Sequence, residues 1–144
     1  MYKNADLLGI IQSSEPFSVR DVGTFWPLVK TEKASVFYIE IQKIPPHYHR
    51  KTEETFTIIK GKGTAKFYPP RNPIDESISL LGESFEEMSR VSRNMPISPT
   101  SVVIIPPFEP HEIEKDKNFK YIGAILVCDP PLDPKDEIGL EVKT

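Results

Sequence analysis

The chain has 144 residues, which is enough for one ordinary domain with a single hydrophobic core. With 38% hydrophobic and 27% charged residues, its composition is that of a soluble globular protein and disfavours the disordered and membrane classes. The net charge is only −3, and the Lys and Arg residues are scattered among acidic ones, so we expect no nucleic-acid partner and no membrane partner.

The first part of the chain has a short apolar stretch with no clear secondary-structure pattern, followed by two strand-like pieces. Residues 1–12 include an apolar stretch that is too brief to span a membrane and lacks the order of a secretion signal, so we expect a cytoplasmic protein. The stretch fits either a short helix or an arm. Phe17–Asp21 and Thr24–Lys30 are predicted strands separated at Gly23. We therefore expect an N-terminal arm with strands over residues 1–34.

The next segment alternates between apolar and polar residues, which is typical of a strand with one buried face. Over Ser35–Lys43 the buried face is predicted to carry Phe37, Ile39 and Ile41. Pro45 and Pro46 cannot donate backbone hydrogen bonds, so we expect them to end the ladder or to lie at a sheet edge.

Two further strands and a long connection follow. The strands are predicted over Glu54–Ile59 and Thr64–Tyr68, with a hairpin turn at Lys60–Gly63. Residues 69–101 form a connection that is long for a small barrel and fits a lid or an interaction flap. Within it we predict a brief strand at Ser77–Leu81, the only helical pattern of the chain at Glu83–Ser92, and a loop at Arg93–Thr100.

The last strands complete an all-β pattern. They are predicted over Val102–Ile105, Glu112–Glu114 and Lys120–Val127. The tail after Asp129 has three prolines and many charges and is expected to wrap along the outside or to be partly loose. Short strands joined by turns, in a chain with 15 prolines, predict a sandwich or barrel with minor helical content. Residues 35–133 would form the barrel and 134–144 a C-terminal tail, within a single domain.

The three histidines carry the main functional signal. His47 and His49 are two residues apart, so on an extended chain both imidazoles project from one face. Glu54 begins the next strand, and its carboxylate would lie opposite the two rings if that strand runs antiparallel. His111 follows the apolar strand and its proline turn. Such nitrogen and oxygen ligands suit Fe, Mn, Ni, Co or Zn, and four ligands on an octahedral ion leave two positions open.

Simpler interpretations exist for each of these residues. His47 and His49 could belong to an exposed basic turn, and His111 taken alone could be a hydrogen-bonded residue without a ligand role. Glu53 should point away from Glu54 on an extended chain, so we expect it on the surface.

Two segments resemble the motifs of the cupin superfamily. The first is H-Y-H-R-K-T-E-E-T-F-T-I-I-K-G, from His47 to Gly61, in which the spacing to the glycine selects Glu54 as the acid. The second is P-P-F-E-P-H, from Pro106 to His111, in which a proline-bounded turn precedes the third histidine. This segment departs from the family pattern at Phe108, where a glycine is usual.

The resemblance, which covers roughly Ser35 to Asp133, implies a fold, a cofactor and a partner. The fold is a double-stranded β-helix of the jelly-roll kind. The cofactor is one divalent transition metal ion held by His47, His49, Glu54 and His111. Pairing of cupins through their sheets implies a homodimer, in which Phe17–Lys30 could be a swapped or interfacial element.

Three functions stay open at the level of sequence. The first is a metal-dependent enzyme acting on a small organic molecule, of dioxygenase, isomerase, lyase or cyclase type, of which the dioxygenase type would be an oxidoreductase. The second is a non-catalytic cupin that binds a sugar or metabolite, and the third is a barrel stabilised by a structural metal. No catalytic residue beyond the metal ligands is identified. The single cysteine, Cys128, excludes a disulfide within the chain and is expected to be a buried, inert thiol.

Overall fold

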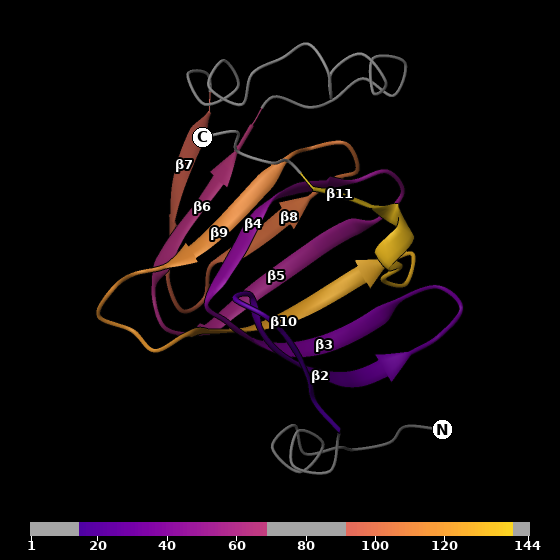
Figure 1. Ribbon diagram of the computed structural model, residues 1–144, viewed down its shortest axis with the longest axis horizontal. Helices are drawn as coiled ribbons and strands as arrows, with labels where there is room; N and C mark the ends of the chain where they lie inside the picture. The colour runs from indigo at the N-terminus through magenta and orange to yellow at the C-terminus, as the bar shows by residue number, and fades with distance from the viewer. Residues whose placement is uncertain (1–14, 69–91, 140–144) are drawn as a thin grey trace.

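The computed structural model describes residues 15–68 and 92–139, which form two antiparallel sheets facing each other (Figure 1). The larger sheet has the strand order β1 (Phe17–Val19), β2 (Gly23–Lys30), β3 (Ser35–Ile41), β10 (Ile122–Asp129), β5 (Glu53–Lys60) and β8 (Val102–Ile105). The smaller sheet has the order β11 (Glu137–Gly139), β4 (Lys43–His49), β9 (His111–Lys115), β6 (Gly63–Phe67) and β7 (Arg93–Ile97).

Alternating burial along the strands explains why the two sheets pack together. On β3, the side chains of Phe37, Ile39 and Ile41 are buried as the sequence pattern predicts, and β10 alternates in the same way. Apolar side chains from both sheets meet in one core, which includes Phe56 of β5 and Ile113 of β9. The hydrophobic effect of this burial is the main favourable term that holds the sheets face to face.

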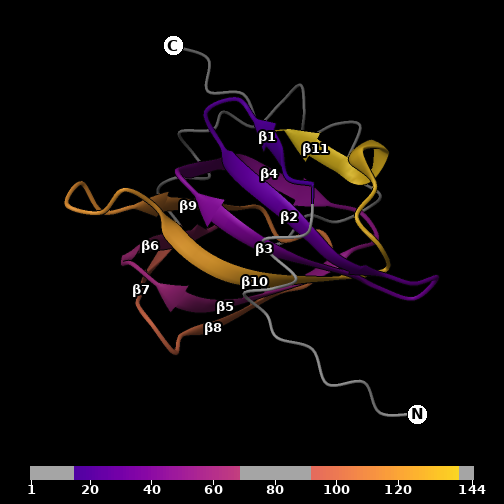
Figure 2. The same ribbon diagram turned by 90° about the horizontal axis from the view of Figure 1, so that it is seen from below.

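The chain order passes repeatedly from one sheet to the other, and this confirms the predicted fold class. β3 lies in the larger sheet, β4 in the smaller, β5 in the larger and β6 in the smaller. Non-consecutive strands therefore become neighbours, as for β10, which lies between β3 and β5 (Figure 2). Such an arrangement is a double-stranded β-helix of the jelly-roll kind. The predicted minor helical content is limited, in the described residues, to the 3-10 turn Pro134–Asp136.

The two prolines near the first histidine interrupt the ladder, as predicted, but they do not end the strand. β4 continues through Pro45 and Pro46, although its pairing with β11 covers only His47–His49. The pairing of β4 with β9 shifts register between Ile44 and His47, so the prolines lie at a bulge where no ladder hydrogen bond from their nitrogens is required.

The prediction of a loop over Arg93–Thr100 is wrong for its first half. Residues Arg93–Ile97 form β7, which pairs with β6 at the edge of the smaller sheet. Their sequence has no clean alternation, and Pro96 argues against a strand. An edge position tolerates a proline, so pairing with β6 overrides the weak local preference.

Several expectations concern residues outside the described ranges. These are the N-terminal helix or arm, the strand at Ser77–Leu81, and the helix at Glu83–Ser92 apart from its last residue. In the part of the chain that is described, no helix has the length and apolar character needed to cross a membrane.

Candidate metal centre

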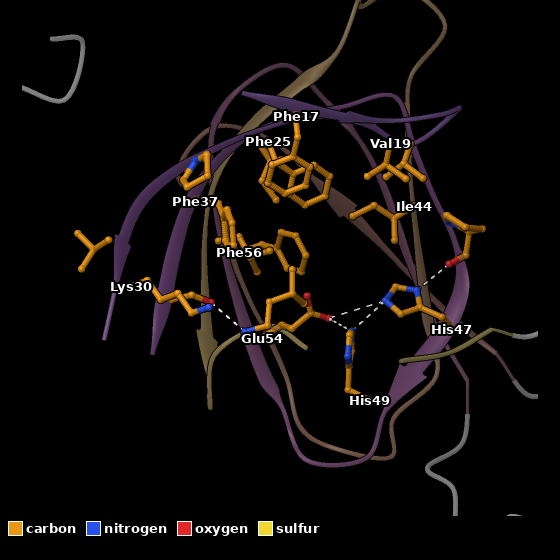
Figure 3. A pocket seen from close by; sticks show the side chains of 18 residues that line it. Phe17, Val19, Phe25, Lys30, Phe37, Ile44, His47, His49, Glu54 and Phe56 are labelled. Atoms are coloured by element: carbon orange, nitrogen blue, oxygen red, sulfur yellow. Dashed lines mark hydrogen bonds and ion pairs between the residues drawn. The ribbon is translucent and has the colours of Figure 1, made fainter. Parts of the chain in front are cut away.

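The four side chains singled out by the sequence come together between the two sheets. His47 and His49 lie at the end of β4, and His111 opens β9, where it pairs in register with His47. Glu54 is the second residue of β5 in the opposite sheet, and Figure 3 shows its carboxylate directed toward His47 and His49. Two residues of spacing on β4 place both imidazoles on one face, as predicted.

The ligand atoms form a cluster of the size of an ion site. All four lie within 4.8 Å of one another. Glu54 Oε1 is 3.0 Å from His49 Nε2 and 3.2 Å from His111 Nε2, and the Nε2 atoms of His47 and His49 are 3.1 Å apart. Ligands bound at about 2.1 Å and at right angles lie about 3.0 Å from each other, so these separations suit a first-row divalent metal.

Backbone carbonyls fix the orientation of two of the imidazoles. His47 Nδ1–H donates to the Pro45 carbonyl oxygen at 2.8 Å, and His111 Nδ1–H donates to the Glu109 carbonyl oxygen at 3.0 Å. Because a carbonyl can only accept, the neutral form of each ring carries its proton on Nδ1. The Nε2 lone pairs of both rings are therefore directed into the cluster, which is the tautomer a metal ligand requires.

Burial and neighbouring groups set the charge states of His47 and Glu54. Each of the four side chains is at most 5% exposed. Burial, together with the neighbouring His111, lowers the pKa of His47 to about 3, so the His47 ring is neutral at ordinary pH. Burial alone would raise the pKa of Glu54, but the contacts with His111 and His49 outweigh it and hold the pKa well below its usual range. Neutral imidazoles and an ionised carboxylate are the states in which these groups bind a metal.

Asp136 supports the site from the C-terminal segment, and the sequence did not indicate this. Its buried carboxylate accepts hydrogen bonds from the backbone N–H groups of Lys51 and Thr52, and Oδ2 lies 4.0 Å from His49 Nδ1. The strand β11 that follows pairs with β4 opposite His47 and His49. No local pattern in the proline-rich tail predicts this contact, because it depends on pairing with a strand that lies about 85 positions earlier.

The turn before His111 keeps its geometry without the usual glycine. Phe108 has a φ of +63°, in the left-handed region that glycine favours. Its backbone N–H donates to the carbonyl oxygen of His49 at 2.7 Å, and its ring lies 6.3 Å from that of Tyr48. These contacts hold the left-handed residue in place and connect the turn directly to the end of β4.

Other expectations at the site can also be compared with the structure. Glu53 is exposed, as predicted, while Phe56 is buried and lines a cavity beside the cluster. Cys128 is fully buried, and burial together with the charge of Glu54 raises its pKa to about 12, so its thiol is protonated.

Solved structures share this architecture at low sequence identity. A variant of Streptomyces Pac13 with uridine is 13% identical, over 91% of this chain and 88% of that chain, with a TM-score of 0.63. KdgF from Halomonas sp. is 13% identical, over 86% of this chain and 94% of that chain, with a TM-score of 0.59. These neighbours share the double-stranded β-helix described above. The chain has the cupin fold.

A longer cupin-fold protein matches over part of its length. Oxalate decarboxylase from Lactobacillus farciminis, in a formate complex, is 17% identical over 90% of this chain, with a TM-score of 0.63. The chain spans 34% of that protein. Pac13 is described as a nucleoside dehydratase, so the neighbours of this cupin fold include enzymes of different reaction types. No family model and no curated protein matches the sequence.

Proposed function

We propose that the protein is a metal-dependent enzyme that acts on a small organic molecule. The observation that carries the proposal is the buried cluster of three imidazoles and one carboxylate next to a cavity of about 560 Å³. His47, His49 and Glu54 line this cavity, so the cluster is accessible from it. Its volume falls in the range of about 300–1,000 Å³ that is typical of small-molecule sites.

Two buried polar atoms support a metal at this point. Glu54 Oε1 and His111 Nε2 are buried and have no hydrogen-bond partner among the described residues. Leaving such groups without a partner costs about 1–3 kcal/mol each, and more for a charged group. A divalent cation bound to both atoms would offset this cost. The residues present therefore fit a metal, and His47, His49, Glu54 and His111 would hold it.

When bound, the ion would supply Lewis acidity toward a carbonyl, enolate or similar oxygen of the substrate. The chain's own residues would hold its charge and position, with the backbone carbonyls of Pro45 and Glu109 orienting two of the imidazoles. The apolar wall of the cavity would exclude water and strengthen electrostatic interactions inside it. Iron, manganese, nickel, cobalt and zinc all suit this ligand set.

A second candidate is a non-catalytic cupin that binds a metabolite through the metal. It is favoured by the scarcity of acid–base groups, because the only polar lining residues besides the ligands, among those described, are Lys30 and Ser35. A purely structural metal agrees less well with a cluster that borders a cavity.

Cobalt(II) spectroscopy tests whether a bound ion keeps open coordination positions. The protein is stripped of metal, loaded with Co(II) and titrated with azide, a small anion that occupies open positions. We expect the visible absorption bands of Co(II) to shift on addition of azide. Absence of a shift would favour a structural metal and contradict the enzyme and binding proposals together.

Two alanine variants close together in the sequence, one at a proposed ligand and one at an exposed residue, serve as test and control in this assay. His49→Ala should remove most of the Co(II) signal, because it deletes a ligand. Glu53→Ala should leave the signal nearly unchanged, since Glu53 is exposed on the opposite face of β5. Equal losses in both variants would mean that the wrong acid has been assigned.

We also propose that the protein is a homodimer. Ile59, Val102 and Ile104 lie on the outer face of the larger sheet, on the paired strands β5 and β8, and are 45–61% exposed. Exposed apolar side chains gathered on neighbouring strands often mark a protein–protein pairing surface. Light scattering should give twice the chain mass of 16.4 kDa, and Ile104→Glu should give the single mass. A wild-type mass of 16.4 kDa would contradict the proposal.

A further inference from the structure

The cavity beside the metal cluster is almost entirely apolar. Of the 18 described residues that line it, only His47, His49, Glu54, Ser35 and Lys30 are polar. Three of these belong to the metal cluster. Ser35 is already engaged, because its Oγ accepts a hydrogen bond from the Leu132 N–H at 2.9 Å. The cavity therefore offers a ligand few hydrogen-bonding groups away from the metal.

Aromatic rings form the part of the cavity farther from the metal cluster. Phe17 stacks on Phe25 with ring centroids 5.1 Å apart, and Phe37 meets Phe25 edge to face at 6.0 Å. Figure 3 shows these three rings on one side of the cavity, with Glu54, His47 and His49 converging on the other. Offset and edge-to-face contacts are the arrangements that rings prefer, so a further planar ring could join this group.

The rim of the cavity exposes apolar side chains that a bound molecule would cover. Phe17 and Val19 of β1 are each 43% exposed, and Val29 of β2 is 52% exposed, although all three line the cavity. Water contact with such surface is unfavourable, and an apolar ligand would remove it. A polyhydroxylated ligand would instead leave its own hydroxyl groups without partners, which a site of this kind rejects.

With a divalent ion bound, the charge of the site would favour an anion. One ionised carboxylate and three neutral imidazoles leave a divalent ion with a net charge of +1. Lys30 is the only basic side chain among the described lining residues that are not imidazoles, and the lining has no acid besides Glu54. A ligand with an anionic oxygen group would thus complement the metal end of the cavity.

We infer that the natural ligand is an organic anion with an apolar body of aromatic size, its oxygen atoms at the metal cluster and its body among Phe17, Phe25 and Phe37. The inference rests on the proposed metal function and specifies its substrate class. It separates this chain from cupin-fold proteins whose ligands are strongly polar, such as the uridine of the Pac13 structures.

Calorimetric titration with three probes tests the inference. The protein is loaded with Mn(II), its metal content is measured, and pyruvate, phenylpyruvate and uridine are titrated separately. Pyruvate and phenylpyruvate share a 2-oxo acid head and differ in one ring. We expect phenylpyruvate to bind about 10- to 100-fold more tightly than pyruvate, because removing a phenyl ring from water raises binding affinity by about this factor. Uridine should show no measurable binding.

Exposed residues of the same type provide matched variants that should fold normally. Phe17→Ser should weaken phenylpyruvate binding about 3- to 10-fold and leave pyruvate binding unchanged. Phe119→Ser should change neither, because Phe119 is 36% exposed and does not line the cavity. Val29→Ser and Val102→Ser form a second pair, with exposures of 52% and 54%, of which only Val29 lines the cavity.

The possible outcomes separate failure of this inference from failure of the proposed function. Two results in a protein that retains Mn(II) would overturn the ligand class and leave the metal site intact. One is equal affinity for pyruvate and phenylpyruvate, and the other is tighter binding of uridine than of phenylpyruvate. A protein that retains no metal and binds neither acid would overturn both. If Phe17→Ser changes the oligomeric mass and neither acid binds, the rim is a protein interface and the inference is wrong.

Discussion

Replacement of Asp136 tests whether the C-terminal segment is part of the metal centre. Asp136→Ala removes the acceptor for two backbone N–H groups. Thr52 is 1% exposed, so its N–H would lose its partner without access to water, at a cost of about 1–3 kcal/mol. Lys51 is exposed, and water can replace the carboxylate there. With the weakened attachment of β11, we expect the free energy of unfolding to fall by about 2–3 kcal/mol.

The same substitution should also weaken metal binding. Loss of a residue that supports a metal ligand typically lowers affinity about 10- to 100-fold. The distance of 4.0 Å between Asp136 Oδ2 and His49 Nδ1 exceeds a hydrogen bond, so we expect the lower end of this range, about tenfold. Urea denaturation of the metal-free protein measures the first effect, and competition with a chromogenic chelator measures the second.

Asp133→Ala is the matched control, because Asp133 is exposed and its carboxylate accepts a hydrogen bond from the nearby Lys135 N–H. It should change the free energy of unfolding by less than about 0.5 kcal/mol and leave metal affinity unchanged. If Asp136→Ala and Asp133→Ala bind metal equally well, the claim that Asp136 supports metal binding is refuted. If Asp136→Ala is as stable as Asp133→Ala, the claim that the Asp136 carboxylate stabilises the fold is refuted.

Two further predictions concern the barrel around the site. Gly61→Ala should lower the free energy of unfolding by more than about 2 kcal/mol, because Gly61 has a φ of +83° and a Cβ there would lie 2.5 Å from the Tyr121 carbonyl oxygen. Gly123→Ala should cost less, since its Cβ would meet side-chain atoms at 3.2 Å; equal losses in urea denaturation would contradict this. Cys128 should not react with a thiol reagent at pH 8 in the native state, because it is buried and its pKa is raised to about 12. If the native protein reacts as fast as the urea-unfolded chain, Cys128 is not a buried, protonated thiol.

The sequence was sufficient to predict the fold class and the four side chains that meet in the buried histidine and glutamate cluster. Alternation at Phe37, Ile39 and Ile41 is a local signal of a one-sided strand, and the structure buries all three. The spacing of His47 and His49 likewise follows from the period of a strand, and the structure brings them together with Glu54 and His111. These signals are local or depend on a motif.

The features that could not be predicted depend on contacts between distant segments. Asp136 lies in a tail without periodicity, and its role is decided by the register of β11 on β4. β7 forms because β6 offers a free edge to it, and the bulge at Pro45 and Pro46 results from pairing with β9. The apolar cavity depends on how β1 and β2 are placed over the larger sheet, and the residue types alone do not specify this.

Anomalous X-ray diffraction from crystals of protein purified without added metal tests the central claim most directly. Data collected at the absorption edge of the element found by elemental analysis should show one peak, about 2.0–2.3 Å from Nε2 of His47, His49 and His111 and from a carboxylate oxygen of Glu54. Absence of a peak between these four side chains, or a His111 ring turned away from it, would contradict the account.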